Sequence, residues 1–325
     1  MARPLFASVL LCLAAAGAAS AAQPGFGLPA KTQEEMPVLL VSTDWLGNYL
    51  GDANLVLLHV GDRAEYDAAH IPGARFVSLL DLSEPMEGPD ALHLQMLPPD
   101  RLRPRLEALG ISDGSRIVVY FGSEWISATT RMLFTLDYAG LGARAAMLDG
   151  GQPAWVKQGR AITAEAPVVP PGKLSPLSPR PSIVDAKFVF EHRATPGYAI
   201  LDARDAVFFE GTDRGGPEEK PHRAGHVAGA RSLPYSSLFT DDLHLRPRDE
   251  LRAAFAKAGV KPGDVVVAYC HIGQQATAVI HAARLLGFEA KLFDGSFEQW
   301  SGLPAAEAPV EMPAPPAQPQ EKPAS

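Results

Sequence analysis

The chain has 325 residues, 46% of them hydrophobic, with a formal net charge of −8 and a pI of about 5.6. An acidic chain without a basic run is a poor partner for nucleic acid or for an anionic membrane surface. The length and the apolar content instead favour two globular domains, each with its own core.

The N-terminal segment has the pattern of a secretory signal peptide. Arg3 precedes an apolar run over residues 5–19, and small residues follow it. Because this run is too short for a membrane span, we expect residues 1–22 to be cleaved and the mature protein to be periplasmic or secreted, without membrane attachment. Cys12 would leave with the signal peptide, so Cys270 would be the single cysteine of the mature chain and no intramolecular disulfide could form.

The first half of the mature chain alternates predicted strands and helices. In chain order these are a strand over 55–60, a helix over 63–69, a turn over 70–74, a strand over 117–120, and a strand with an Asp-Gly turn over 147–151. This alternation is typical of a small α/β domain with a mostly parallel sheet.

The second half repeats this order. Its predicted elements are a strand over 199–203, a turn over 226–230, a strand over 265–269, a helix over 276–286 that ends before Gly287, and a strand with a turn over 292–296. At a constant offset of 149 residues, Gly110 falls on Gly259 and Ile117 on Val266. Trp155 and Trp300 close the two halves and are predicted to be packing residues. The pattern indicates a duplicated domain.

These patterns divide the chain into five segments. The predicted signal peptide comes first, and residues 37–160 form an N-terminal domain. A linker over 161–181, with six prolines after Ala164, should be extended and stiff. Residues 182–303 form a C-terminal domain. Residues 304–325, rich in proline and alanine, are predicted to be a disordered tail.

The two copies differ at positions that carry chemistry. Phe121 occupies the position of Cys270, and the stretch 59–61 (His-Val-Gly) matches 202–204 (Asp-Ala-Arg). Two separated differences in the same copy suggest that Arg204 and Cys270 belong to one site, and that only the second copy is catalytic.

The surroundings of Cys270 favour a nucleophile. The cysteine ends a buried strand and precedes a helix, so backbone N–H groups and a helix N-terminus converge near its thiol. Such surroundings stabilise a thiolate and can also hold an anionic substrate or leaving group. The alternative is a small, inert cysteine buried at a strand end.

These residues resemble those of the tandem-domain rhodaneses, the family of thiosulfate and 3-mercaptopyruvate sulfurtransferases. The resemblance rests on the Asp-x-Arg stretch at 202–204, the His-Val-Ala-Gly-Ala turn at 226–230, the Tyr-Cys-x-x-Gly loop at 269–273, and the Phe-Asp-Gly-Ser stretch at 293–296. It implies two tandem rhodanese-like α/β domains, each a mostly parallel sheet flanked by helices, with an inactive N-terminal domain that forms one wall of the site.

The resemblance also implies roles for individual residues. Cys270 is the catalytic residue, which takes the outer sulfur of a donor as a persulfide and passes it to cyanide or a thiol. The substrate-binding positions are His271, Ile272, Gly273, Gln274, Gln275 and Arg204, and Asp202 supports Arg204 by pairing with it beneath the loop. The implied partners are a small anionic sulfur donor such as thiosulfate and a cyanide or thiol acceptor. The family needs no metal or organic cofactor, and a monomer is expected.

The loop after Cys270 departs from the family pattern. Thiosulfate-selective members carry basic side chains there, whereas this chain has His271 and Ile272, and it does not match the Cys-Gly-Ser-Gly pattern of the mercaptopyruvate enzymes either. Uncharged amides, as in Gln274 and Gln275, hold an anion less strongly than arginine does. An insertion over 211–223 brings four further basic or titratable residues, namely Arg214, Lys220, His222 and Arg223. They form either a substrate clamp or a solvated loop.

Three other interpretations of these residues are a phosphatase, a sulfur-relay module and a metal site. A dual-specificity phosphatase would need an arginine six residues after the cysteine, where this chain has Ala276. A sulfur-relay module would hold a persulfide for a partner protein without turning over small donors. A metal site at His222 and His226 would need further ligands, and His226 is already explained by the repeated turn.

Overall fold

The computed structural model describes residues 39–123, 126–219 and 221–312. The predicted signal peptide and residues 313–325 of the predicted tail lie outside these residues. The first domain contains β1 (Leu39–Val41), α1 (Thr43–Tyr49), β2 (Leu55–Val60), α2 (Arg63–Ala68), β3 (Arg75–Val77), η1 (Leu79–Leu82), α3 (Pro99–Ala108), β4 (Arg116–Phe121), α4 (Ile126–Tyr138), η2 (Gly142–Arg144), β5 (Ala145–Leu148) and α5 (Gly151–Lys157).

The second domain follows the same order. It contains β6 (Ile183–Val184), α6 (Ala186–His192), β7 (Tyr198–Asp202), α7 (Ala206–Phe209), β8 (His226–Val227), β9 (Arg231–Ser232), η3 (Tyr235–Leu238), α8 (Arg248–Lys257), β10 (Val265–Tyr269), α9 (Ala276–Leu286), β11 (Ala290–Phe293), α10 (Ser296–Gly302) and β12 (Val310–Glu311). The predicted strands and helices around the repeat are thereby confirmed, and α9 ends at Gly287, whose φ of 92° suits a glycine.

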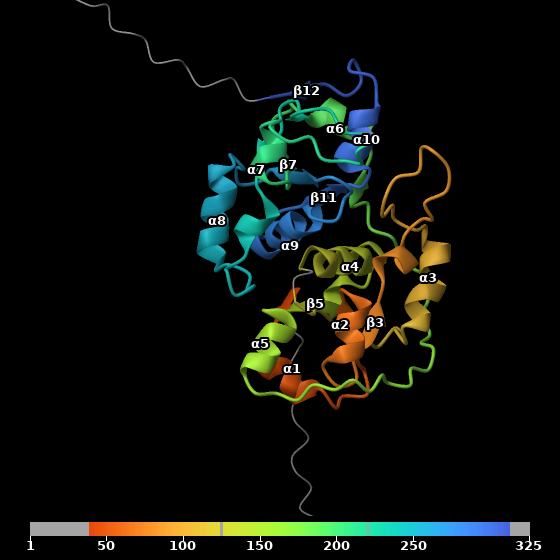
Figure 1. Cartoon of the computed structure of the whole chain (residues 1–325). Coiled ribbons are helices and arrows are strands. Elements are labelled where there is room, and N and C mark those ends of the chain that lie inside the picture. The colour runs from red at the N-terminus through yellow and green to blue at the C-terminus, as the bar shows by residue number, and fades with distance from the viewer. Residues whose placement is uncertain (1–38, 124–125, 220, 313–325) are drawn as a thin grey trace, which may run out of the picture. The chain divides into compact units, whose positions relative to one another are not determined.

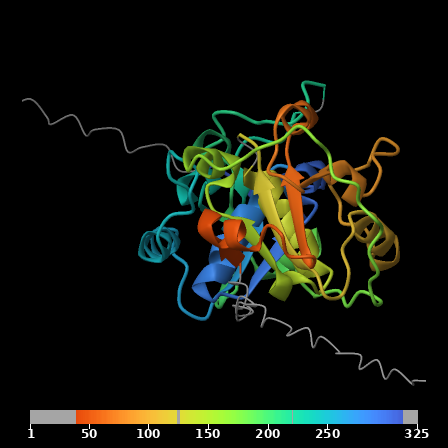
Figure 2. The ribbon, with the colours of Figure 1, turned by 90° about the horizontal axis from the view of Figure 1, so that it is seen from below.

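Each domain is built on a five-stranded parallel sheet. The strand order is β1-β5-β4-β2-β3 in the first domain and β6-β11-β10-β7-β9 in the second. Helices flank both sheets (Figure 1), and the strands of the first domain lie side by side in the view of Figure 2. The predicted α/β class with mostly parallel sheets is confirmed. Both predicted packing residues are buried, with Trp155 2% and Trp300 0% exposed.

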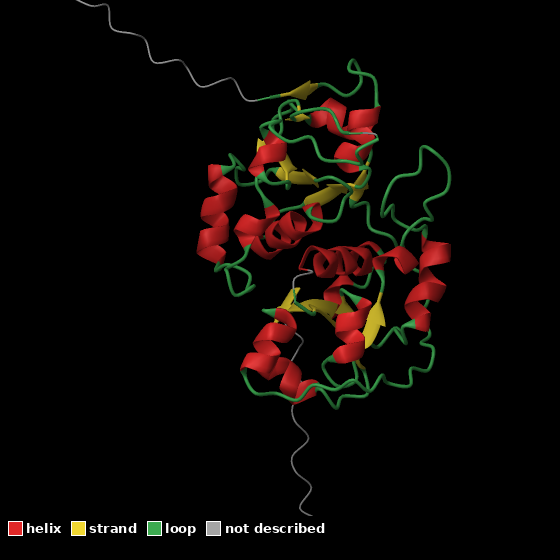
Figure 3. Cartoon of the chain, in the orientation of Figure 1, coloured by secondary structure: helices red, strands yellow, loops and turns green. Residues whose placement is uncertain are grey.

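The two domains meet along α4 and α9, which lie side by side in Figure 3. Thr130 Oγ1 and Thr277 Oγ1 are 2.9 Å apart near the helix starts, and Arg284 Nη1 lies 2.9 Å from Asp137 Oδ2 near the ends. Because the same offset relates both pairs, the two helices run in parallel. Within the described parts of the chain, no helix has the length and hydropathy of a membrane span.

A loop of each domain binds the Asp-Gly turn of the other. The backbone N–H of Met96 donates to Asp294 Oδ2 (2.8 Å), and that of Leu245 donates to Asp149 Oδ1 (3.0 Å). These two contacts place the end of β11 directly against the first domain.

The segments outside the two repeats are only partly as predicted. The linker has no helix or strand between 164 and 182, as expected. The prediction of a disordered tail is wrong for residues 304–312, because β12 pairs with β8 in antiparallel fashion and Ala308 is fully buried. The burial of Ala308, the strand pairing, and hydrogen bonds to Ala308 O and Pro309 O order this stretch, and its proline-rich composition gives no sign of them.

Candidate active site

A short loop joins β10 to α9 and begins with Cys270. We call residues 270–276 the cysteine loop. Cys270 is the free cysteine of the described residues, and it is 0% exposed. The strand ends here because Cys270 N–H, instead of continuing the ladder, donates to Ser296 Oγ at 3.2 Å. The thiol therefore lies below the surface, between the end of the sheet and the start of α9.

Three carbonyl groups of the cysteine loop accept hydrogen bonds from α10 and from α4. Phe297 N donates to Cys270 O at 2.9 Å, and Glu298 N donates to His271 O at 3.0 Å. The carbonyl of Gly273 accepts from Arg131 Nη1 at 3.1 Å. In a planar trans peptide the C=O and the following N–H point in opposite directions.

The N–H groups that follow these carbonyls therefore point to the opposite side of the loop. Among the described residues, none of the backbone N–H groups of 271–276 donates a hydrogen bond. Convergent N–H groups without acceptors form a concavity that favours an anion. The five loop positions predicted from sequence to bind substrate, 271–275, thus share one feature, a backbone N–H without an acceptor among the described residues.

Gly273 is the position where the cysteine loop depends on glycine. Its φ is +79°, and a Cβ there would lie 2.8 Å from the backbone oxygen of Asp294. We expect Gly273→Ala to destabilise the protein by about 1–3 kcal/mol, because the loop must move away from Asp294. Urea unfolding checks this. An unchanged free energy of unfolding would contradict the geometry.

The first domain contributes a buried arginine to the cysteine loop. Arg131, on α4, is 2% exposed and donates to Gly273 O, to Asp294 Oδ1 (2.7 Å) and to Leu94 O. Gln274 Nε2 donates to Ser127 Oγ on the same helix at 2.9 Å. The first domain therefore holds the cysteine loop directly and does more than form a wall beside it.

Asp202 and Arg204 form a buried ion pair, as expected. Arg204 Nη2 lies 2.6 Å from Asp202 Oδ2, and both side chains are 0% exposed. Tyr269 Oη, one residue before the cysteine, also donates to Asp202 Oδ2 at 2.7 Å. Burial lowers the pKa of Arg204, but the bond and charge of Asp202, with a contribution from Cys270, hold that pKa above its usual value. Arg204 Nη1 is buried without a hydrogen-bond partner among the described residues.

His271 is a neutral group at this site. Burial, reinforced by the positive charge of Arg204, lowers the pKa of His271 to about 4. Its ring meets Phe208 edge to face at 4.5 Å and lies 5.9 Å from the His222 ring. A Cβ on Gly215 would lie 2.7 Å from His271 Cε1. The insertion thus packs closely against the cysteine loop.

Most described residues of the insertion over 211–223 are exposed, which agrees with the solvated loop, one of the two alternatives that the sequence left open, but its last two residues are anchored. Arg223 Nη2 donates to two carbonyls in the C-terminal segment, at 2.6 and 2.7 Å, so its charge is used for structure. Arg214 is exposed, and Lys220 lies outside the described residues. His222, a buried side chain, is what the insertion brings to the site.

Other predicted residues have contacts of their own. The side-chain amide of Gln274 is engaged with the first domain, and Gln275 Oε1 is buried without a partner among the described residues. Ile272 is half-buried. His226 Nδ1 is 2.7 Å from Phe209 O, and the two rings stack at 3.6 Å, so His226 serves the turn. In the described ranges no three metal-type side chains come together.

The corresponding position of the first domain holds a buried aromatic cluster. Phe121 replaces the cysteine and is 0% exposed. His59, in place of Asp202, is also 0% exposed, and neither ring nitrogen has a partner among the described residues. Its ring lies against Tyr120 and Tyr66, with centroids 5.0 and 5.4 Å away. This copy therefore has neither the thiol nor the buried ion pair of the second copy.

His59 should make the fold sensitive to acid. Burial lowers the pKa of His59 to about 4 from 6.5, so the unfolded chain binds one more proton between these values. The stability that depends on a neutral His59 ring is fully present above pH 6.5. As the pH falls from 6.5 toward 4, the free energy of unfolding drops by up to about 1.4 kcal/mol per pH unit. We expect His59→Phe to flatten the profile over this window. Urea unfolding of both proteins at pH 7 and pH 4.5 tests it, and parallel profiles would contradict it.

Sequence reasoning missed Arg131. Adding 147, the offset that relates Thr130 to Thr277, places it on Ala278. The sequence does contain a signal for Arg131, because it is an arginine inside an apolar helix and aligns with an alanine in the other copy. The partner groups, a carbonyl of Gly273 and the side chain of Asp294, lie far away in the chain and could not be paired with it beforehand.

Comparison with known proteins agrees with this architecture. The model of the rhodanese-like domain matches twice, at residues 42–158 and 186–303. The chain is 30% identical over 281 residues to the sulfur carrier protein TtuD of Thermus thermophilus, covering 82% of this chain and 95% of that protein. It is 32% identical over 239 residues to a protein named probable 3-mercaptopyruvate sulfurtransferase from Pseudomonas aeruginosa, covering 72% and 82%.

Solved structures share the fold. The anaerobic ergothioneine biosynthesis enzyme from Chlorobium limicola superposes with a TM-score of 0.74 at 23% identity, covering 85% of this chain and 70% of that one. YnjE gives a TM-score of 0.72 at 22% identity, covering 84% and 68%. With both domain matches and a full-length relative at 30% identity, the chain belongs to the rhodanese family and carries two rhodanese-like domains in tandem.

Proposed function

We propose that this chain is a sulfurtransferase that moves the outer sulfur of thiosulfate, or of a related donor, to cyanide or a thiol through a persulfide on Cys270. One observation carries the proposal. A buried thiol begins a loop whose backbone N–H groups, from 271 to 276, have no acceptor among the described residues. Donors arranged in advance around a thiolate, a persulfide or a departing anion stabilise each of these charges without reorganisation.

The reaction consists of two displacements on sulfur. The Cys270 thiolate attacks the outer sulfur of thiosulfate, an Sγ–S bond forms, and the S–S bond of the donor breaks with its electron pair leaving on sulfite. The acceptor, cyanide or a thiolate, then attacks the outer sulfur of the persulfide and frees the Cys270 thiolate. Cyanide becomes thiocyanate and a thiolate becomes a persulfide, so no external oxidant or reductant is needed.

The neighbouring groups have distinct parts in this proposal. Arg204, fixed by Asp202, places a permanent positive charge near the thiol, which favours anionic donors. Its unpaired Nη1 is the side-chain N–H that we assign to the donor. Because the pKa of His271 is about 4, His271 stays neutral near pH 7 and contributes its backbone N–H without a charge.

The cysteine loop itself does not select the donor. Residues 271–276 include no lysine or arginine, so charge recognition falls to Arg204 and to neutral donors. We propose thiosulfate as the first donor and mercaptopyruvate as the alternative. A provisionally named thiosulfate sulfurtransferase of Haloferax volcanii, 29% identical over 285 residues, supports the first choice, and the Pseudomonas aeruginosa relative supports the second.

The test measures both half-reactions. Sulfite release is followed with thiosulfate and cyanide, and mercaptopyruvate is tested in parallel as donor. The mass of the peptide that contains Cys270 is measured after incubation with the donor alone. We expect the added mass of one sulfur atom on that peptide and steady turnover with at least one donor. Absence of both, on folded protein with a titratable thiol, would falsify the proposal.

A second candidate is a sulfur carrier that holds the persulfide for a partner protein. The name of the Thermus thermophilus relative, a sulfur carrier protein, favours it. The same experiment separates the two. A carrier gains the sulfur mass on Cys270 but passes it to cyanide or to small thiols only very slowly.

We also propose that the protein is exported and monomeric. The apolar run over 5–19 is the observation that supports export. N-terminal sequencing of protein from the periplasm and the medium tests this, and a chain that begins near residue 22 is the expected result. Light scattering tests the mass.

A further inference from the structure

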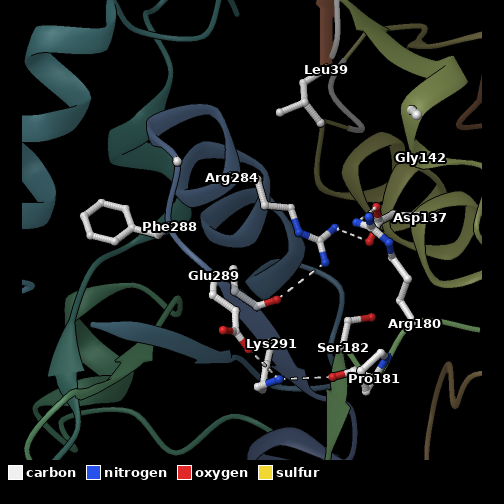
Figure 4. Close-up of a pocket in the computed structure, with 13 residues that line it drawn as sticks. Leu39, Asp137, Gly142, Arg180, Pro181, Ser182, Arg284, Phe288, Glu289 and Lys291 are labelled. Atoms are coloured by element: carbon white, nitrogen blue, oxygen red, sulfur yellow. Dashed lines mark hydrogen bonds and ion pairs between the residues drawn. The ribbon is translucent and has the colours of Figure 1, made fainter. Parts of the chain in front are cut away.

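A second site lies at the opposite end of α9 from Cys270. A cavity of about 510 Å³ is lined by the end of α4, the segment 180–182, the last turn of α9 and the start of β11 (Figure 4). The 11 residues of α9 separate it from the cysteine loop by about 16 Å. It therefore belongs to neither the thiol nor the N–H groups discussed above.

Cationic side chains converge on this cavity. Arg180 Nη1 and Arg284 Nη1 bind the two oxygens of the same carboxylate, Asp137, at 3.0 and 2.9 Å. Lys291 Nζ lies 2.8 Å from Glu289 Oε1 and donates to Pro181 O at 3.1 Å. The lining thus holds three cations and two carboxylates.

The carboxylates do not fully balance these cations. The side chain of Glu289 is 62% exposed and is solvated, whereas those of Arg284 and Lys291 are each 17% exposed. Burial lowers the pKa of Arg284, the charge of Asp137 raises it only in part, and the nearby Arg180 lowers it further. An additional anion would offset the burial of positive charge.

A buried hydroxyl in the same lining lacks a partner. Ser182 is 6% exposed, and Oγ has no hydrogen bond with any described residue. Its backbone is fixed on both sides, because its N–H donates to Arg180 O and its carbonyl accepts from Leu292 N, both at 2.8 Å. A buried hydroxyl without a partner is costly, and in Figure 4 it lies among the cations.

We propose that this cavity binds a small oxyanion, of the phosphate or sulfate class. The oxygens of the anion accept hydrogen bonds from Arg180, Arg284 and Lys291 and from the Ser182 hydroxyl. The bonds from the three cations are charge-assisted and therefore stronger than neutral ones. Because the lining comes from both domains and from the segment that joins them, bound anion stabilises the docked arrangement of α4 and α9. The inference does not depend on sulfur transfer.

The experiment measures the thermal unfolding midpoint against added sodium phosphate or sodium sulfate, with sodium chloride at the same ionic strength as reference. The variants are Arg180→Gln and Ser182→Ala. Arg252→Gln is the matched control, because Arg252 is also a half-exposed arginine paired with a carboxylate, Asp249. Calorimetric titration with phosphate gives the dissociation constant.

We expect the midpoint of the unsubstituted protein and of Arg252→Gln to rise saturably with phosphate or sulfate, beyond the effect of chloride. Arg180→Gln and Ser182→Ala should raise the dissociation constant about tenfold. In anion-free buffer Ser182→Ala should be at least as stable as the original. An equal rise in all four proteins, or a rise that chloride reproduces, overturns the proposal.

Discussion

Replacing Cys270 by serine is expected to abolish sulfite release, with a loss of at least ~10³-fold. The serine hydroxyl has nearly the shape of the thiol but stays protonated near neutral pH, so no comparable nucleophile remains. The first domain cannot compensate, since Phe121 stands in the matching position. Steady-state assays with thiosulfate and cyanide measure the loss, and peptide masses after donor alone should show no added sulfur.

Cys270→Ala is the companion variant. Cys270 is fully buried, so a serine hydroxyl could perturb the loop, whereas alanine adds no polar group. Both variants should keep the circular dichroism spectrum of the original and lose turnover together. Residual turnover in both, at a rate above the buffer reaction, would show that sulfur moves by a route other than a Cys270 persulfide.

The repeated fold could be predicted from the sequence because its signals are local. Apolar strands over 55–60 and 265–269 are bounded by turn residues, and the helix that ends before Gly287 is long. The order of the tail could not be predicted, because it depends on a distant pairing. Val310 meets Val227 across 82 intervening residues, and neither segment of two residues has a pattern of its own.

The site was predictable to the extent that it is encoded in one copy and missing from the other. Comparing the copies assigned Cys270 and Arg204 to one site, and the family resemblance implied the pairing of Arg204 with Asp202, an ion pair that the structure contains. Contacts between the domains left no such trace. Two hydrogen bonds depend on how α4 and α9 dock. The Gln274 amide donates to Ser127 Oγ, and Arg131 donates to Gly273 O.

Arg131→Met is expected to weaken both the fold and the cysteine loop. The loss leaves Asp294, 8% exposed in its side chain, without its positive partner, which costs about 3–5 kcal/mol for a buried pair. It also releases Gly273 O, so the N–H of Gln274 is no longer fixed toward the anion. We expect kcat with thiosulfate to fall about tenfold or more at a temperature where the variant remains folded. Urea unfolding and steady-state kinetics check both effects.

The matching contact on the other side of the interface separates positioning from stability. Asp149 is the counterpart of Asp294 in the first domain. It accepts a hydrogen bond from Leu245 N, and its Oδ2 lies 3.0 Å from His244 Nδ1. These partners lie outside the cysteine loop. Asp149→Asn should therefore destabilise the docked domains while kcat stays near the original value. Arg131→Lys should recover stability more than turnover, because one ammonium group cannot reach both Asp294 and Gly273 O in the geometry of a guanidinium. Equal losses of kcat in Arg131→Met and Asp149→Asn would mean that Arg131 acts only through stability.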